Sequence, residues 1–319
     1  MMRSRFGTLA SFLFAIVLLS GCAATQTSAL LSAAKANLPR QVELKTTPFI
    51  AQERYQCGPA ALAMTLRTAG VDISADALVP QVYIPQREGS LQVEMLAAGR
   101  RNGAFSMAIP PRMEALVAEL AAGRPVLVLQ NLSLPIAPRW HYAVVIGYNL
   151  DRAEIILRSG TTERLVMRMA TFEHTWARSR HWGMVTLPPG VLPATAGEAE
   201  VLDALVAFEK RSAPAAARQT YALAAQRWPA NMTLALGLGN TAYAAGDKLA
   251  AAEAFQRAST VQPDSGPAFN NLAVVLMELG RLPEARAAAE KALALGGPFR
   301  QAALDTLASI GLAEKSAKP

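Results

Sequence analysis

The sequence predicts two structural units, an α+β domain followed by an all-α module, and three observations lead to this interpretation. Between residues 57 and 122, apolar residues recur with a helical period, and from residue 125 to 187 they form short runs typical of strands. Helices followed by strands indicate an α+β fold, and the short connections favour an antiparallel sheet. Beyond residue 197 alanine and leucine increase and a period of about 34 residues appears, which indicates helical repeats.

Composition favours a folded protein and gives no support to a nucleic-acid partner. Of the 319 residues, 52% are hydrophobic and 17% are charged, which is typical of a chain with a buried core. The formal net charge is +7, but the basic residues are scattered and are not interleaved with aromatic residues. Nucleic-acid sites instead concentrate lysine and arginine on one face or along one helix.

The N-terminus has the pattern of a targeting segment. Arg3 and Arg5 precede an apolar stretch from Leu9 to Leu19, which is short for a membrane span and ends in small residues before Cys22. The segment resembles a bacterial lipoprotein signal, with residues 1–21 as the signal peptide. The alternative is an ordinary signal peptide followed by a chance cysteine.

The lipoprotein resemblance implies that Cys22 carries lipid and anchors the protein to a membrane surface without spanning it. Ala23 follows, and by the sorting rule of Gram-negative lipoproteins a residue other than aspartate there implies the outer membrane, with the chain facing the periplasm. Residues 22–47 are predicted to form a tether, with a short helix between Ala29 and Leu38. A lipidated Cys22 leaves Cys57 without a disulfide partner, because the chain has two cysteines.

The first folded domain is placed at residues 48–190 and begins with four predicted helices. Apolar periodicity, N-cap serines at positions 74 and 90, and terminal glycines define them. The predicted helices cover Cys57–Ala69, Ser74–Pro80, Ser90–Asn102 and Pro111–Ala122. Strands are predicted over residues 125–130, 140–148, 154–158, 164–169 and 182–187.

The stretch around Cys57 is the candidate catalytic centre. Pro59 suits the first turn of a helix, where its missing N–H costs little, so Cys57 is expected at a helix N-terminus. Peptide dipoles at this position favour an anion, and a thiolate is an anion. Gln52 offers an amide N–H for an oxyanion, as acyl transfer requires. The alternative is a structural cysteine, since this residue type is often buried.

The candidate general base is His141, which opens a predicted strand between two aromatic residues and is therefore expected at the rim of the sheet. Paired with Cys57, it would hold the thiol as a thiolate near neutral pH. The alternative is a hydrogen-bonded core histidine. His174 and His181 lie in a polar stretch and are interpreted as surface residues. No paired Cys/His spacing indicates a metal site.

Together these motifs resemble the bacteriocin-processing, double-glycine peptidase family of papain-like cysteine peptidases. The matching stretches run from Gln52 to Leu62, from Gly89 to Leu91 and from His141 to Tyr148. The resemblance is close from residue 48 to about 160 and extends loosely to about 190. It implies a papain-like α+β fold that hydrolyses peptide bonds without a cofactor.

Carried over position by position, the resemblance implies that Cys57 is the nucleophile, His141 the general base and Gln52 the residue that completes the oxyanion hole. One position departs from the family pattern. The aspartate that usually follows the next strand and orients the imidazole falls here on about Ser159. A serine can hydrogen-bond to the imidazole but carries no charge, and loss of the orienting acid costs about 10⁴ in rate in a serine triad.

Two other functions remain open from the sequence. The first is a catalytically weak or inactive lipoprotein that holds a peptide without cleaving it and acts as an envelope assembly scaffold. The second is a transferase, such as a transglutaminase-like cross-linker, that uses the same acyl-enzyme. The default interpretation is a lipoprotein cysteine peptidase whose substrate is a peptide bond in an envelope or exported protein.

Residues 197–313 resemble about three tetratricopeptide repeats. Pro229 and Pro263 are one repeat period apart, and three further positions recur in the same phase. These positions are Ala217, Ala251 and Ala285; Ala224, Ala258 and Ala292; and Tyr221, Phe255 and Ala289. Small residues allow close helix packing, and the aromatic residue fills the gap. The resemblance implies a superhelix whose concave face binds a peptide or protein partner. The alternative is an unrelated helical bundle.

Overall fold

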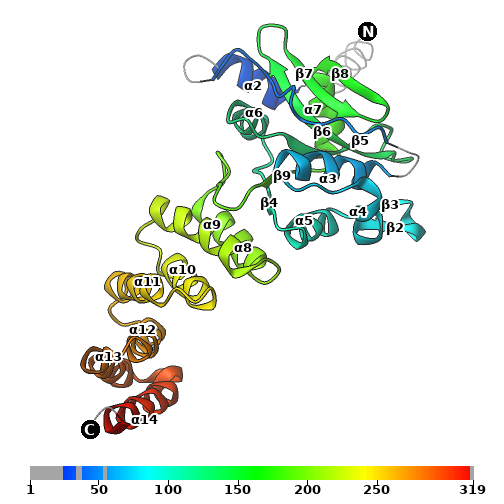
Figure 1. Ribbon diagram of the computed structural model, residues 1–319. Helices are drawn as coiled ribbons and strands as arrows, with labels where there is room; N and C mark the ends of the chain where they lie inside the picture. Colours follow the sequence, from blue (N-terminus) through cyan, green and yellow to red (C-terminus); the bar gives the residue numbers. More distant parts are fainter. Residues whose placement is uncertain (1–23, 34–37, 53–55, 317–319) are drawn as a thin grey trace, which may run out of the picture.

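A seven-stranded antiparallel sheet lies at the centre of the α+β domain (Figure 1). The computed structural model describes residues 24–33, 38–52 and 56–316. The sheet has the order β4-β9-β5-β6-β7-β8, and β1 pairs with β6. Its strands are β1 (Gln41–Glu43), β4 (Phe105–Ala108), β5 (Val126–Asn131), β6 (Trp140–Asn149), β7 (Glu154–Ser159), β8 (Thr162–Arg168) and β9 (Gly183–Leu187). The prediction of an antiparallel sheet is confirmed.

Helices cover both faces of this sheet, which explains why β5 and β6 are apolar along most of their length. One face carries α3 (Cys57–Thr68), α4 (Ala75–Val82) and α5 (Gln92–Arg101). The other carries α2 (Thr25–Ala33), α6 (Met113–Ala121) and α7 (Met169–Ala177). Alternate residues of β6 enter the two cores, because successive side chains of a strand point to opposite faces.

The described part of residues 22–47 belongs to the domain, so the prediction of a tether is wrong for it. Leu30 of α2 is buried, and β1 pairs with β6. The buried Glu173 carboxylate accepts hydrogen bonds from the backbone N–H groups of Gln26 (3.1 Å) and Thr27 (2.7 Å). A carboxylate stabilises a helix N-terminus. It comes from a residue far along the chain, so no local pattern could show it.

Two boundaries test the predicted helix caps. Ser74 caps α4, where its hydroxyl accepts a hydrogen bond from the Ala77 N–H at 3.2 Å, as predicted. The predicted Ser90 cap is wrong. Ser90 lies in the short strand β3 (Gly89–Ser90), which pairs with β2 (Tyr83–Ile84), and α5 begins only at Gln92. A 3₁₀ turn, η2 (Pro85–Arg87), joins the two strands.

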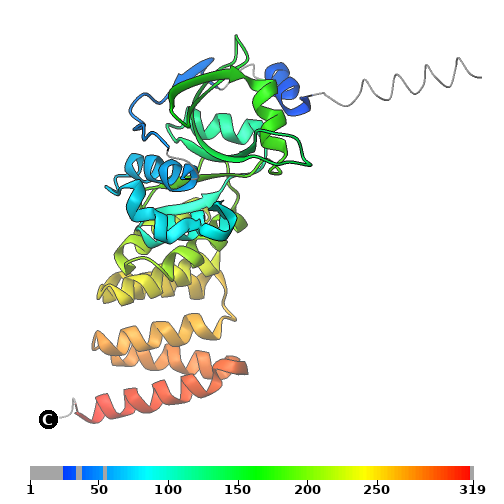
Figure 2. The ribbon, with the colours of Figure 1, turned by 90° about the vertical axis from the view of Figure 1, so that its right-hand side faces the viewer.

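The C-terminal unit consists of three helix pairs and a final helix, stacked in layers that extend away from the sheet (Figure 2). Its elements are α8 (Glu198–Glu209), α9 (Pro214–Arg227), α10 (Met232–Ala244), α11 (Lys248–Val261), α12 (Gly266–Glu278), α13 (Leu282–Leu295), η3 (Gly297–Phe299) and α14 (Arg300–Ser316). The alanines that recur once in each repeat are buried. Gly237 contacts the Tyr221 ring so closely that a Cβ there would overlap it, which confirms the predicted close packing around the aromatic position.

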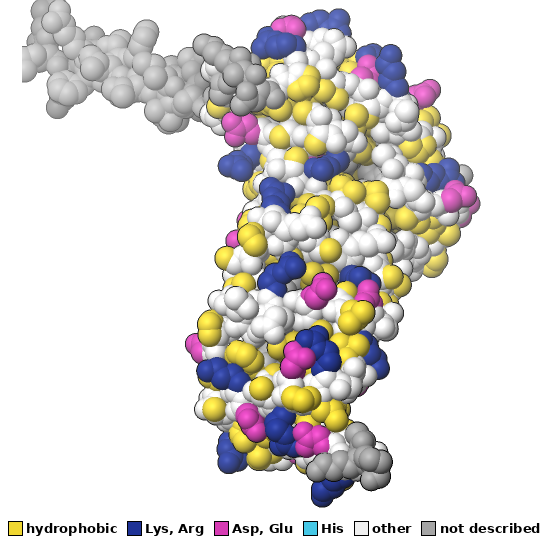
Figure 3. All heavy atoms as spheres, turned by 60° about the vertical axis from the view of Figure 1, so that its left-hand side comes forward, with side chains coloured by type: hydrophobic (Ala, Val, Ile, Leu, Met, Phe, Trp, Pro, Cys, Tyr) yellow, Lys and Arg dark blue, Asp and Glu magenta, His cyan; other side chains and the backbone are white. Residues whose placement is uncertain are grey.

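The first repeat packs directly onto the sheet. Phe208 of α8 meets Phe105 of β4 edge-to-face, with ring centroids 5.7 Å apart, and Val201 and Leu205 enter the same core as the strand. The hydrophobic core therefore continues from the sheet into the helical unit. Basic and acidic side chains are interspersed along the face shown in Figure 3. Within the described ranges, no helix is long and apolar enough to cross a membrane.

Candidate active site

Helix α3 presents Cys57 at its first residue, as the position of Pro59 predicts. Gln56 is the N-cap residue and its side chain makes no capping hydrogen bond. Gly58 is required next to the cysteine, because a Cβ there would overlap the Ser90 side chain of β3. The β2–β3 hairpin can therefore pack against the start of the helix.

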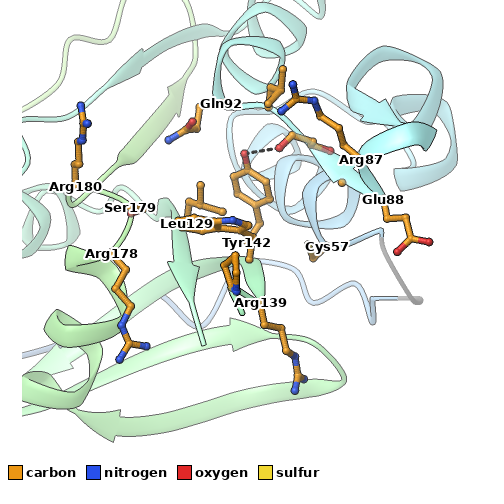
Figure 4. Close-up of a pocket in the computed structure, with 15 residues that line it drawn as sticks. Cys57, Arg87, Glu88, Gln92, Leu129, Arg139, Tyr142, Arg178, Ser179 and Arg180 are labelled. Atoms are coloured by element: carbon orange, nitrogen blue, oxygen red, sulfur yellow. Dashed lines mark hydrogen bonds between the residues drawn. The ribbon is translucent and has the colours of Figure 1, made fainter. Parts of the chain in front are cut away.

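Cys57 lines a cleft of about 780 Å³ that five segments of the chain surround (Figure 4). The segments are the start of α3, the β2–β3 region, strand β5, the start of β6 with the loop before it, and the connection from α7 to β9. Leu129 and Tyr142 form part of the apolar wall, and arginines lie on the other sides. The cleft is large enough for a segment of peptide.

Tyr142 is a central residue of this cleft that sequence analysis treats only as a neighbour of the histidine. Its hydroxyl donates a hydrogen bond to the Ser90 carbonyl at 3.0 Å, and its ring meets Trp182 edge-to-face. Burial, and to a smaller extent the negative charge that Cys57 carries when it is deprotonated, raise the pKa of Tyr142, which keeps the hydroxyl protonated. The strand period offers the missed signal, since it places Tyr142 on the α3 face of the sheet.

The electrostatics of Cys57 differ from the sequence prediction. Burial raises the pKa of the thiol, and hydrogen bonds from the backbone N–H groups of Tyr142, Gly58 and Cys57 itself lower it by less. The sulfur packs against the apolar core beneath α3, where a charged thiolate loses hydration. The prediction of a thiol pKa lowered by the helix N-terminus is therefore wrong for this structure.

His141 immediately precedes Tyr142 in β6. Its side chain therefore points to the opposite face of the sheet, because successive side chains of a strand alternate between the two faces. Its Nε2 and the Ser159 hydroxyl oxygen lie 2.9 Å apart, so the hydrogen bond considered at the predicted third position is present. Burial, and next the positive charge of Arg139, lower the pKa of His141 to about 4. The imidazole is therefore neutral at pH 7. Among the described residues, no hydrogen bond joins it to the Cys57 sulfur.

Gln52 reaches the backbone carbonyl of Tyr142, the residue after the histidine. Its Nε2 donates a long hydrogen bond of 3.4 Å to the Tyr142 carbonyl, and its backbone N–H donates to the Gly160 carbonyl at 3.1 Å. Its side-chain oxygen is buried and has no hydrogen-bond partner in the described structure. The structure thus brings Gln52 and Cys57 together at the backbone of Tyr142, while the imidazole of His141 is held by Ser159.

The two remaining histidines, which the sequence analysis interprets as surface residues, are both partly buried. His181 is not a free surface residue, because its ring packs edge-to-face on Trp176 at 5.0 Å and burial lowers its pKa. Helix α7, which was not predicted, places that tryptophan beneath it. His174 is partly buried on the same helix. In the described part of the chain, no group of three or more His, Cys, Asp or Glu residues is arranged to hold a metal ion. Cys22 lies outside the described residues.

Comparisons with known proteins identify both units. Residues 44–184 match the model described as the Peptidase_C39 like family, and residues 236–298 match that of a tetratricopeptide repeat. The α+β unit is thus a C39-like peptidase domain and the helical unit is a tetratricopeptide module, in agreement with the fold class predicted from the sequence. No curated protein matches the chain.

Several solved structures are similar to one unit or the other. A C39-like peptidase from Bacillus anthracis is 17% identical, with a TM-score of 0.38 over 46% of this chain and 97% of its own. The Yersinia enterocolitica type III secretion chaperone SycD, in complex with a peptide of the translocator YopD, is 16% identical, with a TM-score of 0.34 over 36% and 93%. The Sgt2 tetratricopeptide domain from Aspergillus fumigatus is 22% identical, with a TM-score of 0.34 over 38% and 84%.

Proposed function

We propose that this chain, which joins a C39-like peptidase domain to a tetratricopeptide module, hydrolyses a peptide bond with Cys57 as the nucleophile. The observation that carries the proposal is the position of Cys57, at the first residue of α3 and in the wall of the cleft. A nucleophile at a helix N-terminus beside a peptide-sized cleft is the arrangement that acyl transfer needs.

In the proposed mechanism, His141 takes the thiol proton as the Cys57 sulfur attacks the substrate carbonyl, and returns it to the leaving amine. Water then hydrolyses the thioester, which releases the acid and restores the thiol. The Gln52 amide and the Cys57 backbone N–H bind the oxyanion. The bond from Gln52 to the Tyr142 carbonyl is long, so an oxyanion competes for the amide readily.

Ser159 acts as a positioning residue in this mechanism. Its hydroxyl engages Nε2 of His141. Nδ1 is therefore the ring nitrogen that takes the thiol proton, in a substrate complex that brings the imidazole to the Cys57 sulfur. Burial raises the pKa of Cys57 and lowers that of His141, so the resting pair is neutral at pH 7. Proton transfer therefore takes place in the substrate complex, where the developing oxyanion is stabilised, and not before substrate binds.

The neutral resting pair also favours a second function, a domain that binds a peptide in the cleft without cleaving it. A neutral thiol is a weak nucleophile, and Ser159 supplies no charge to stabilise an imidazolium. The helical module would then scaffold an assembly of envelope proteins. The retained Cys57, His141 and Gln52 set favours hydrolysis over this alternative.

Cleavage in ¹⁸O-labelled water separates these functions. Protein lacking residues 1–22 is incubated with pools of blocked peptides and with a labelled primary amine. Hydrolysis places one ¹⁸O in each new carboxyl group, and Cys57→Ala abolishes it. Incorporation of the amine instead identifies a transferase. Peptide binding by both proteins without any product would contradict hydrolysis and support the binding function.

The same proposal includes a lipid anchor at Cys22 that holds the protein at the outer membrane, facing the periplasm. The basic residues, the short apolar stretch and the small residues before Cys22 support it. Metabolic labelling with a fatty-acid analogue is expected to mark the wild type, and Cys22→Ser is expected to release the protein into the soluble fraction. Membrane attachment of an unlabelled Cys22→Ser variant would contradict the anchor.

We further propose that the tetratricopeptide module recruits a protein partner or the substrate itself. Its three stacked helix pairs support this role, since such arrays bind peptides on their concave face. Cross-linking in the bacterial envelope, followed by mass spectrometry, is expected to recover a partner with the full chain. A version that ends at residue 196 serves as the comparison only if it remains folded, because α8 shares the core of the sheet.

A further inference from the structure

We infer that the cleft beside Cys57 selects peptides that carry carboxylate side chains near the bond to be cleaved, and that Arg87, Arg139 and Arg180 recognise these carboxylates. We call these three residues the arginine rim. The inference rests on the proposed function, because the same cleft holds the nucleophile. It adds a substrate class that the fold and the family match do not specify.

The arginine rim is assembled from three separate segments (Figure 4). Arg87 ends the 3₁₀ turn between β2 and β3, Arg139 ends the β5–β6 loop, and Arg180 lies between α7 and β9. All three are exposed, and none forms an ion pair with an acidic residue in the described structure. Glu88 is the single acidic residue among the described residues that line the cleft, and in Figure 4 its side chain points away from that of Arg87.

A fourth arginine, Arg178, holds the β5–β6 loop in place and is not counted as part of the arginine rim. Its guanidinium donates hydrogen bonds to the carbonyls of Asn131 (2.9 Å) and Ser133 (2.7 Å) at the start of the β5–β6 loop. The Asn131 side-chain oxygen accepts hydrogen bonds from the backbone N–H groups of Ser133 (3.0 Å) and Arg139 (2.9 Å). The backbone of Arg139 is therefore positioned before a ligand binds, which lowers the entropy cost of ordering the loop.

Backbone strain in the described chain is concentrated at the same cleft. Four non-glycine residues have positive φ, and three of them are Glu88 (46°), Arg180 (58°) and His181 (56°). Such conformations are unfavourable for residues with a Cβ and persist where the surrounding structure enforces them. Here Trp176 enforces the turn, since its ring N–H donates to the Trp182 carbonyl at 2.7 Å. Turns with positive φ thus determine the backbone position of two residues of the arginine rim, Arg87 and Arg180.

The lining between the arginines points to a peptide and not to a simple anion. Leu129, Trp140 and Tyr142 give the cleft an apolar wall, and Trp140 is half exposed. A peptide with alternating apolar and acidic side chains can contact both the apolar wall and the arginine rim. An inorganic anion would pair with the arginines but leave the apolar wall exposed to water. The proposed peptide hydrolysis requires the same type of ligand.

The rim is also electrostatically linked to the proposed base. The charge of Arg139 is one of the causes that lower the pKa of His141. A substrate carboxylate beside Arg139 offsets this charge and raises the pKa of the imidazole in the complex. An acidic substrate would therefore help His141 to take the thiol proton, whereas a basic substrate would hinder it.

The test measures binding separately from cleavage. The Cys57→Ala variant of the protein lacking residues 1–22 is titrated against three peptide pools by fluorescence anisotropy with an uncharged dye. The peptides have blocked ends and identical compositions, except that two positions near the centre carry Glu, Gln or Lys. We expect the Glu pool to bind at least about tenfold more tightly than the Lys pool at low ionic strength, with Gln between them and a smaller difference at high salt.

Variants of the rim make the test specific. Each of Arg87→Gln, Arg139→Gln and Arg180→Gln is expected to weaken binding of the Glu pool about two- to fivefold, as exposed charge pairs do. The triple variant is expected to remove the preference and to keep its affinity for the Gln pool. Arg257→Gln, which removes an exposed arginine of α11, is the matched control and is expected to change nothing.

Equal binding of the three pools, or a preference that survives the triple variant, would overturn the inference. An oligonucleotide of equal charge that binds more tightly than the Glu pool would overturn it in favour of a nucleic-acid ligand. The peptidase proposal fails separately. A Glu preference in binding without cleavage by protein carrying Cys57 supports the rim and contradicts hydrolysis, and cleavage without charge preference contradicts the rim alone.

Discussion

The peptidase domain and the helical module are stabilised in different ways. In the module, each helix packs on its neighbours in sequence, and a repeated glycine–aromatic contact such as Gly237–Tyr221 sets their spacing. In the domain, the supporting contacts join distant parts of the chain, such as Glu173 with α2 and the buried Arg158 with the Thr47 carbonyl at 3.0 Å. A destabilising substitution in the outer repeats, whose helices pack in a separate hydrophobic cluster, is therefore expected to act locally. One in the domain is expected to disturb the cleft as well.

The strongest test of this difference is Gly147→Ala in the domain. The new Cβ would overlap the Val42 carbonyl oxygen, which is backbone and cannot rotate away. We expect β1 to separate from β6 and the free energy of unfolding to fall by about 3 kcal/mol or more. Urea denaturation followed by circular dichroism measures the loss. Unchanged stability would contradict the close β1–β6 packing.

The pH dependence of stability is a second test, and the expected loss in the free energy of unfolding is nearly as large. The pKa of His141 in the folded state is about 4, against an ordinary value of 6.5. The unfolded chain therefore binds this proton first as the pH falls, so stability that is complete above pH 6.5 is lost progressively towards pH 4. The loss is expected to reach at most about 3 kcal/mol. Thermal unfolding across this range measures it, and a His141→Ala variant that keeps the full dependence would assign the effect to other groups.

A third test is Glu173→Gln, which keeps the shape of the side chain and removes its charge. The two hydrogen bonds to the N-terminus of α2 become weaker, and we expect a loss of about 1–2 kcal/mol. Hydrogen exchange is expected to show faster exchange in α2 and unchanged exchange in the helical module. Equally faster hydrogen exchange in both units would contradict the proposed difference in how they are stabilised.

Gly239→Ala is the counterpart of the first test in the module. The added Cβ would meet the Phe255 ring, which is a side chain and can shift, so we expect a loss of about 1–2 kcal/mol. Any activity at the cleft is expected to remain. An effect as large as that of Gly147→Ala, accompanied by loss of activity, would show that the two units do not differ in this respect.

The smallest expected effect is on the site itself. Ser159→Asp places a carboxylate beside Nε2 of His141, which stabilises the imidazolium and raises its pKa. We expect a several-fold higher rate near neutral pH and an acid limb of the pH–rate profile that moves to higher pH. Ser159→Ala serves as the control. A profile that does not move would contradict the positioning role of residue 159.

The amino-acid sequence predicts those features that depend on local pattern. The start of α3 follows from Pro59, the cap of α4 from Ser74, and the module from its regular repeat period. The order of strands in the family pattern locates Ser159, and its hydroxyl lies within hydrogen-bond distance of the His141 imidazole.

Features that depend on distant contacts were not predicted. The local pattern assigns Ser90 to a helix, because its pairing with Tyr83 across a turn leaves no local signal. The raised thiol pKa of Cys57 results from the apolar core packed around it, which outweighs the local effect of the helix N-terminus. The arginine rim joins residues from widely separated parts of the sequence, so only the folded chain brings them together.

The continuous core between β4 and α8 has a consequence for how the two units work together. Because Phe105 and Phe208 pack in one core, the first repeat has a fixed orientation relative to the sheet, and no flexible hinge separates it from the cleft. Under the proposed function, a partner held by the first repeat would be presented to Cys57 at a constant separation. The repeat would then act as a molecular ruler that selects a cleavage position by its distance along the bound chain as well as by its sequence.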